Sequence, residues 1–171
     1  MRILLLTLFL TTSLSLFSQE KPFTYEDYKQ KGAPEHLILP EGYTSIADSS
    51  FFGENIISVS IPNSLTTIGD YAFYECRYLK QVINSKVVAS IGKCAFGRCK
   101  RLEAFTLSDK INAIEEYTFE WCYQLTTIKI PEGVTAIGRN AFHFCGNLET
   151  VDFPSTLITI KESAFSFCEH L

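Results

Sequence analysis

The sequence contains little of what catalytic and metal sites are made from. It has three histidines, one tryptophan and one methionine in 171 residues, and His36, His143 and His170 lie in different parts of the chain. It lacks a Gly-x-Ser-x-Gly nucleophile turn, a His-Glu-x-x-His zinc motif, a glycine-rich phosphate loop and a Cys-x-x-Cys pair. We therefore expect no catalytic, metal-binding or cofactor-binding residue and predict a protein that is not an enzyme.

Long apolar runs are confined to the N-terminus. Arg2 precedes a nearly apolar stretch at residues 3–10, and small residues follow up to Ser18. The stretch is short for a membrane span, which needs about 20 residues, and this order of residues is typical of a secretory signal peptide. We predict that residues 1–18 are cleaved off and that the mature chain is secreted or on the cell surface, without a membrane span. An uncleaved anchor is the alternative.

An excess of basic residues is also missing. The 15 basic and 19 acidic residues give a net charge of −4, and loss of Arg2 leaves 14 basic residues and a net charge of −5. This mild acidity argues against a nucleic-acid partner.

What the sequence has in abundance is repetition at a spacing of 23 residues. Four columns of five identical residues keep this period. The columns are Ile68, Ile91, Ile114, Ile137 and Ile160; Phe73, Phe96, Phe119, Phe142 and Phe165; Cys76, Cys99, Cys122, Cys145 and Cys168; and Leu79, Leu102, Leu125, Leu148 and Leu171. A fixed period of 20 to 50 residues is typical of stacked repeat architectures.

The unit that begins at Pro131 shows what each repeat requires. Residues 148–153 end in alternating apolar and polar residues, which indicates a strand, and Pro154 cannot donate a ladder hydrogen bond, so it closes that strand. Residues 137–145 are too short for a free helix and are expected to form a helical or 3-10 turn. A single unit cannot bury its apolar side. We predict an α/β solenoid of stacked 23-residue coils, with one short parallel β-strand per coil and short helical or 3-10 turns opposite.

The repeated string resembles a known family. IGDYAFYECRYL from Ile68 and IGRNAFHFCGNL from Ile137 are similar to the BspA-like leucine-rich repeat. The resemblance implies a right-handed leucine-rich-repeat solenoid on an exported bacterial or microbial-surface protein. It also implies adhesion or protein recognition as the usual role, and it implies no catalytic residue.

The repeats divide the chain into three predicted segments. These are the signal peptide at residues 1–18, an N-terminal cap or irregular segment at residues 19–36, and the solenoid at residues 37–171, with five clear coils plus partial ones. The side chains expected to cover the first coil are Phe23, Tyr25 and Tyr28. Because the sequence stops at Leu171 before the strand of its last coil, we expect a truncated array, with association through the open C-terminal coil as the alternative.

Six cysteines in an exported protein raise the question of disulfides. Five lie in one inward-pointing column, where the spacing between coils of about 4.8 Å permits a bridge by distance. Parallel Cβ directions do not converge, however, so we predict buried free thiols that act as small apolar residues. Cys94 lies outside this column and is predicted to be reactive or to pair with Cys99.

Three surfaces are candidates for binding. The strand face consists of the outward positions of the strand row, namely Lys80, Gln81, Ile83, Glu103, Thr106, Thr126, Thr127, Lys129, Glu149, Thr150 and Asp152. The aromatic ridge consists of Trp121, Tyr123, Phe144 and Phe167, and the basic patch of Arg77, Arg98, Lys100 and Arg101. The strand face is either a surface that binds a partner or an ordinary solvated sheet. The aromatic ridge is either an interface or a row of rings that shield the coil edges. The patch suits an anionic glycan or acidic protein, or is an ordinary charged surface.

Together these patterns predict an exported, non-enzymatic protein-recognition module. We expect a cell-surface or secreted adhesin that binds a host, neighbouring-cell or matrix protein, with an anionic glycan as a further partner. The alternative is a structural or self-associating surface protein that uses its coil ends and aromatic ridge. A secreted hydrolase is a third alternative, which would need polar clusters in a cleft that so short a stack scarcely provides.

Overall fold

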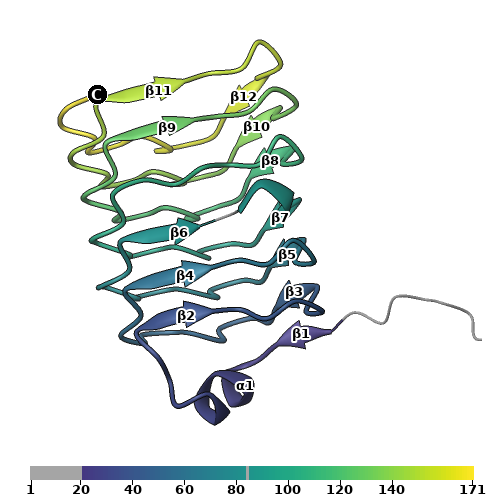
Figure 1. Cartoon of the computed structure of the whole chain (residues 1–171). Coiled ribbons are helices and arrows are strands. Elements are labelled where there is room, and N and C mark those ends of the chain that lie inside the picture. Colours follow the sequence, from purple (N-terminus) through teal and green to yellow (C-terminus); the bar gives the residue numbers. More distant parts are fainter. Residues whose placement is uncertain (1–20, 84) are drawn as a thin grey trace, which may run out of the picture.

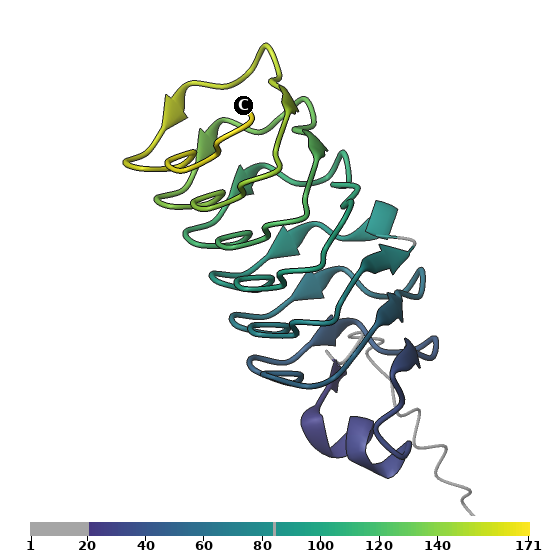
Figure 2. The same ribbon diagram turned by 90° about the vertical axis from the view of Figure 1, so that its left-hand side faces the viewer.

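The computed structural model describes residues 21–83 and 85–171 as a stack of parallel coils (Figure 1). The predicted signal peptide, residues 1–18, lies outside the described residues. The coils follow one another along one axis from α1 (Tyr25–Gln30) to the coil that contains residue 171 (Figure 2). The predicted solenoid is confirmed.

Two rows of short parallel strands run along the stack. Row one, which the sequence predicted, contains β2 (His36–Ile38), β4 (Ser58–Ser60), β6 (Gln81–Ile83), β9 (Thr127–Lys129) and β11 (Thr150–Asp152). Row two contains β1 (Pro22–Phe23), β3 (Ser45–Ile46), β5 (Thr67–Ile68), β7 (Ser90–Ile91), β8 (Ala113–Ile114), β10 (Ala136–Ile137) and β12 (Thr159–Ile160). Paired strands are parallel and in register, so that Ile68 lies beside Ile91. The constant repeat length produces this register.

Row two is an addition to the expected single strand per coil. Its strands are two residues long, and an alternating pattern cannot be recognised in so short a segment. They form because the isoleucine column packs inward while the residue before it takes part in the ladder with the next coil. Ile68 is fully buried, whereas Thr67 is exposed.

Turns connect row two to row one within each coil. In the coil of Phe73, the amides of Tyr74, Cys76 and Leu79 each donate to the carbonyl three residues earlier, at 3.0 Å. The amide of Phe73 instead donates to Ala95 in the next coil, at 2.8 Å. The expected helical or 3-10 segments are therefore linked turns, bonded alternately within and between coils. Among the described residues, regular helix is confined to α1 and the 3-10 helix η1 (Ser85–Val87).

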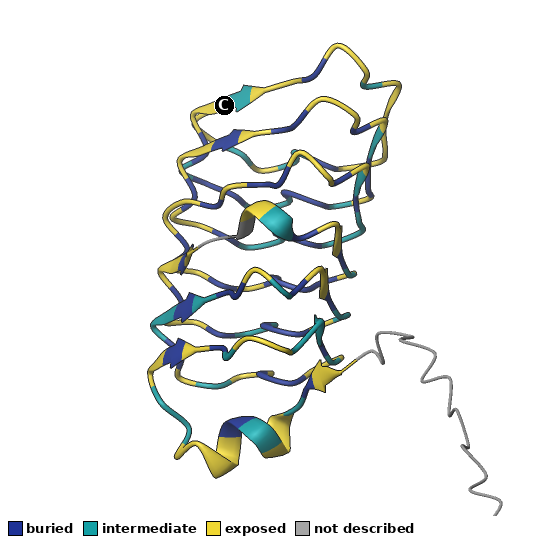
Figure 3. Cartoon of the chain, turned by 45° about the vertical axis from the view of Figure 1, so that its right-hand side comes forward, coloured by how far each residue is buried: buried dark blue, intermediate teal, exposed yellow. Residues whose placement is uncertain are grey.

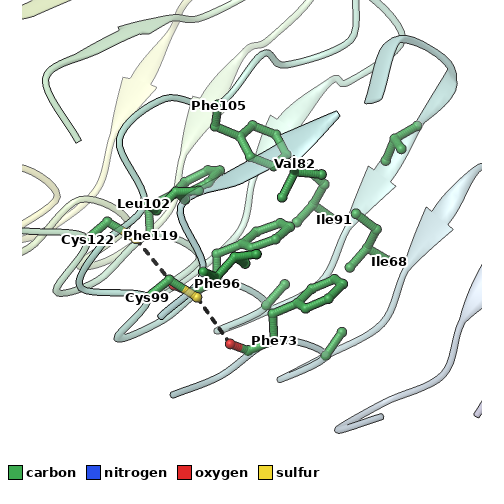
Figure 4. Close-up of a cluster of buried hydrophobic side chains, with 14 of the residues drawn as sticks. Ile68, Phe73, Val82, Ile91, Phe96, Cys99, Leu102, Phe105, Phe119 and Cys122 are labelled. Carbon is green, nitrogen blue, oxygen red and sulfur yellow. Dashed lines mark hydrogen bonds between the residues drawn. The ribbon is translucent and has the colours of Figure 1, made fainter. Parts of the chain in front are cut away.

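The phenylalanine column forms the centre of the core (Figure 4). Ring centroids of Phe73 and Phe96 lie 5.2 Å apart with an interplanar angle of 6°, and those of Phe96 and Phe119 lie 5.6 Å apart at 6°. The stack continues through Phe142 to Phe165 at 5.4 and 5.1 Å. The predicted alignment of like residues is thus confirmed. Phe165, in the last coil, is half-buried.

The cysteine column forms a ladder of hydrogen bonds between coils. The thiol of Cys76 donates to the carbonyl of Phe51 at 2.9 Å, and that of Cys99 donates to Phe73 at 3.2 Å. Cys122, Cys145 and Cys168 repeat this contact with the phenylalanine carbonyl of the preceding coil. All six cysteines are free, as predicted for the column. Burial raises the pKa of Cys76 to about 12 and raises the pKa of Cys99 well above the ordinary thiol value.

The prediction for Cys94 is wrong. Cys94 is buried rather than accessible, and it forms no bridge to Cys99. Burial raises its pKa, outweighing a hydrogen bond from the Tyr71 side chain that lowers it. Because the thiolate is the nucleophile, a raised pKa makes a thiol less reactive.

The first coil is covered by the segment around α1. Thr24 caps this helix with a capping box in which its side chain and that of Asp27 accept reciprocal backbone bonds. Tyr28 is buried against Phe51, with ring centroids 5.3 Å apart, and Phe23 is also buried. Tyr25 is 42% exposed. Of the three aromatic side chains predicted to cover the first coil, Phe23 and Tyr28 are therefore the two that are buried there.

Candidate protein-binding surface

The strand face lies on the outside of row one. Strands β6 and β9 have an exposed, buried, exposed pattern (Figure 3), because alternate strand residues point to opposite sides. Val82 and Ile128 enter the core, and their neighbours point outward. Every predicted residue of the strand face is exposed. These residues are Lys80, Gln81, Ile83, Glu103, Thr106, Thr126, Thr127, Lys129, Glu149, Thr150 and Asp152.

Strand pairing places side chains of neighbouring coils next to each other on this face. Thr127 pairs with Thr150, and Lys129 pairs with Asp152. Bridges through Ala104 connect Gln81 to the same column. Such cross-strand pairs stabilise a sheet modestly, and they also fix the side chains in a regular array.

A hollow interrupts the strand face, and the sequence analysis missed it. It has a volume of about 430 Å³ and is lined by Ala104, Phe105, Thr106, Leu107, Asp109, Thr127, Lys129 and Pro131. It lies where row one has isolated bridges instead of a strand. Ser108 replaces the proline that closes other coils, such as Pro131 and Pro154. Ser85 does so as well after strand β6, so no distinct sequence signal marks the hollow. The hollow gives the face a place for a partner's side chain.

The aromatic ridge is a column of stacked rings. The rings of Trp121 and Phe144 lie 4.0 Å apart at 14°, and those of Phe144 and Phe167 lie 4.4 Å apart at 5°. Trp121 and Phe144 are half-buried, whereas Tyr123 is 45% and Phe167 is 59% exposed. The rings of Trp121, Phe144 and Phe167 therefore shield one another, as the shielding interpretation expected, and Phe167 keeps an exposed face. Tyr123 lies outside this stack and is exposed.

The basic patch contains an acid, Glu75, that the predicted patch left out. Glu75 lies two residues before Arg77 and in the coil that precedes Arg98, and its carboxylate forms ion pairs with both arginines, each at 3.0 Å. Consecutive residues from Arg77 to Arg101 include no acid, but Glu75 lies just before this segment, and coil stacking also places it beside Arg98. Lys100 and Arg101 take part in no ion pair within residues 21–83 and 85–171. The patch is thus narrower than predicted and is centred on these two residues.

Comparison with known proteins decides the family. The family described as "BspA type Leucine rich repeat region" matches residues 44–171 with six copies of its repeat. The chain belongs to the BspA-type leucine-rich-repeat family. No curated protein matches this BspA-type chain.

Solved structures resemble this BspA-type chain over most of its length. A leucine-rich cell surface protein of Faecalibacterium prausnitzii is 32% identical, with a TM-score of 0.74, over 78% of this chain and 39% of that one. A leucine-rich-repeat protein of Bacteroides ovatus is 34% identical, with a TM-score of 0.67, over 80% and 35%. This chain therefore spans less than half of either relative. A leucine-rich-repeat protein of T. pallidum, at 21% identity and a TM-score of 0.64, shares the fold.

The family is one of repeat solenoids, whose surfaces generally bind other proteins. The F. prausnitzii relative is described as a cell surface protein. Across residues 21–83 and 85–171, no helix has the length and apolarity that crossing a membrane requires.

Proposed function

We propose that this chain is a non-enzymatic protein-recognition module of an exported protein, acting as a secreted or cell-surface adhesin. The observation that carries the proposal is the strand face, an array of exposed side chains held in register by row one. Membership of the BspA-type family supports recognition, and the description of the F. prausnitzii relative supports a place at the cell surface. Signal-peptide features at residues 1–18 support export.

The chemistry of the face favours a protein partner. Its centre is neutral and polar, with Thr127 and Thr150, and its margins carry both charge signs, as at Lys129 and Asp152. The lining of the adjoining hollow includes Phe105, which is 6% exposed, and Leu107. A partner that lays a polar surface over the threonines and inserts one apolar side chain into the hollow would satisfy both features.

Binding to a panel of immobilised extracellular-matrix proteins tests the proposal. The double variant Thr127→Arg/Thr150→Arg places bulky charges on the strand face and should weaken binding at least tenfold, or about 1.4 kcal/mol. The matched control is Thr67→Arg/Ser90→Arg, at exposed positions of row two, which should bind like the wild type. Equal losses in both variants, or wild-type binding by the strand-face variant, would count against this surface.

Exposed apolar side chains at the C-terminal coils favour a second candidate, self-association. Ile158 is 82% exposed, Phe167 59% and Phe153 50%. Exposed apolar side chains mark interaction sites where they gather in one patch. Sedimentation velocity should then show larger species as concentration rises, and Ile158→Lys should shift the protein toward monomer. A monomer at every concentration would remove this candidate.

A further inference from the structure

Two hollows meet at Lys100, on the corner where the turns lead into row one. The smaller, of about 160 Å³, is lined by Arg77, Arg98, Lys100 and Trp121. The larger, of about 410 Å³, is lined by Lys80, Lys100, Arg101, Glu103, Tyr123 and Gln124. Because both include Lys100, they form one surface, which we call the Lys100 corner. It shares Lys80 and Glu103 with the margin of the strand face, and its other residues give it a different chemistry.

The Lys100 corner carries uncompensated positive charge. Arg77 and Arg98 share the carboxylate of Glu75, whereas Lys80, Lys100 and Arg101 take part in no ion pair among the described residues. The acid in its lining is Glu103. On a chain whose net charge is −4, such a cluster is a local exception and attracts anions.

The corner also holds aromatic rings beside these cations. The Lys100 Nζ atom lies 5.8 Å from the Trp121 ring centroid, and the Arg101 guanidinium carbon lies 5.3 Å from that of Tyr78. These cation–π contacts orient the charged groups. Tyr123 and Tyr78 remain 45% and 48% exposed, so their rings are accessible to a ligand.

The rings are held in place by the next coil. A Cβ atom on Gly146 would lie 2.5 Å from Cε2 of Tyr123, so the glycine leaves the space that this ring occupies. Trp121 is fixed by Phe144, 4.0 Å away. A site whose side chains are already ordered loses less conformational entropy when it binds.

We propose that the Lys100 corner binds an anionic polysaccharide, a chain whose sugar rings carry sulfate or carboxylate groups. A sugar ring presents an apolar C–H face, which suits Tyr123 and Trp121, and its anionic groups suit Lys100 and Arg101. An acidic peptide also supplies negative charges, but it lacks a flat apolar face beside each charge and therefore fits the rings less well than a sugar does. A nucleic acid supplies both, but the net negative charge of this chain disfavours it.

Heparin, a sulfated polysaccharide, is the probe for the full chain. Isothermal titration should show that Lys100→Ser/Arg101→Ser lowers affinity roughly tenfold or more, because two charge contacts are lost. The control Lys31→Ser/Lys110→Ser removes two exposed lysines elsewhere and the same total charge, and it should bind like the wild type. Similar losses in both variants would mean non-specific attraction and would overturn the site.

Tyr123→Ala separates polysaccharide recognition from simple charge attraction. It leaves every charge in place, and we expect it to lower heparin affinity about fivefold or more while circular dichroism stays unchanged. Poly-aspartate and single-stranded DNA should compete much less well than heparin. Unchanged affinity in Tyr123→Ala, or equal competition by either polymer, would overturn the assignment. Since the strand-face variant Thr127→Arg/Thr150→Arg leaves the corner residues intact, failure here is distinguishable from failure of the adhesin proposal.

Discussion

At the scale of single residues, two positions in each coil adopt a left-handed backbone conformation. Glycine adopts this conformation most easily, yet most of the residues at these positions are not glycine. Tyr71, Cys94 and Tyr117 have φ angles of 56°, 55° and 59°, and Trp121 and Phe144 both have a φ of 59°. This conformation costs roughly 1–2 kcal/mol for a residue with a Cβ atom. Hydrogen bonds between coils over-determine it, as where the Trp121 amide donates to His143 at 2.7 Å. These turns could not be predicted, because their usual sequence signal, glycine, is mostly missing.

Glu120 is a second residue on which its surroundings act, in this case through the pKa of its carboxyl group. Burial raises its pKa above the ordinary value of 4.5, although His143 and Arg98 lower it. The folded state therefore binds this proton more tightly than the unfolded state does. It follows that the free energy of unfolding decreases as pH rises from below the ordinary glutamate range through the raised pKa.

Glu120→Gln should remove this part of the pH dependence. We expect the variant to gain stability relative to the wild type as pH rises through that window, and little difference at pH 3. Urea unfolding at a series of pH values measures it, with Glu149→Gln, an exposed strand-face residue, as control. A stability difference that shrinks with rising pH would contradict the assignment.

At the scale of elements, close approach between coils depends on glycine. A Cβ atom on Gly138 would lie 2.6 Å from both the carbonyl carbon of Glu115 and the amide nitrogen of Glu116. These are backbone atoms of the adjacent coil, which cannot rotate away. A Cβ atom on Gly146 would meet the ring of Tyr123 instead, which is a side chain and can be displaced at a lower cost than backbone.

Gly138→Ala should accordingly destabilise the fold by about 2–3 kcal/mol, in the range of overpacked sites. Gly146→Ala, the matched control, should cost less than about 1 kcal/mol. Urea unfolding of both variants provides the comparison. Similar losses would show that the coils can move apart and that backbone contact does not limit their spacing.

At the scale of the whole molecule, each coil contacts only its neighbours, so the position of a residue in the stack determines its contribution to stability. Phe119 is fully buried between Phe96 and Phe142, whereas Phe165 is half-buried. Phe119→Ala should cost about 3–5 kcal/mol, and Phe165→Ala less than half as much. Chemical denaturation measures both. Equal losses would mean that the last coil is covered in solution.

The period of 23 residues was enough to predict the stack, because like residues can meet only if every coil has the same length. It predicted the Phe73 to Phe165 column, the free thiols of the cysteine column and the exposed strand face. It could not show which carbonyl each thiol contacts, or that Glu75 lies between Arg77 and Arg98. Such contacts depend on how far one coil is displaced over the next, which repeat length does not specify.

The interruption of both strand rows has a mechanical consequence. Between the coil of β7 and the coil of β8, row one retains the single bridge from Ala104 to Thr127, and in the described part of row two no ladder is present. The preceding pair of coils keeps one full ladder, in which β5 pairs with β7, beside the single bridge from Gln81 to Ala104. The pair before that has a ladder in each row, where β3 pairs with β5 and β4 pairs with β6. Under tension along the stack, of the kind that shear flow exerts on a tethered molecule, this level would separate first. Rupture there would leave two shorter stacks, each still joined by its own ladders.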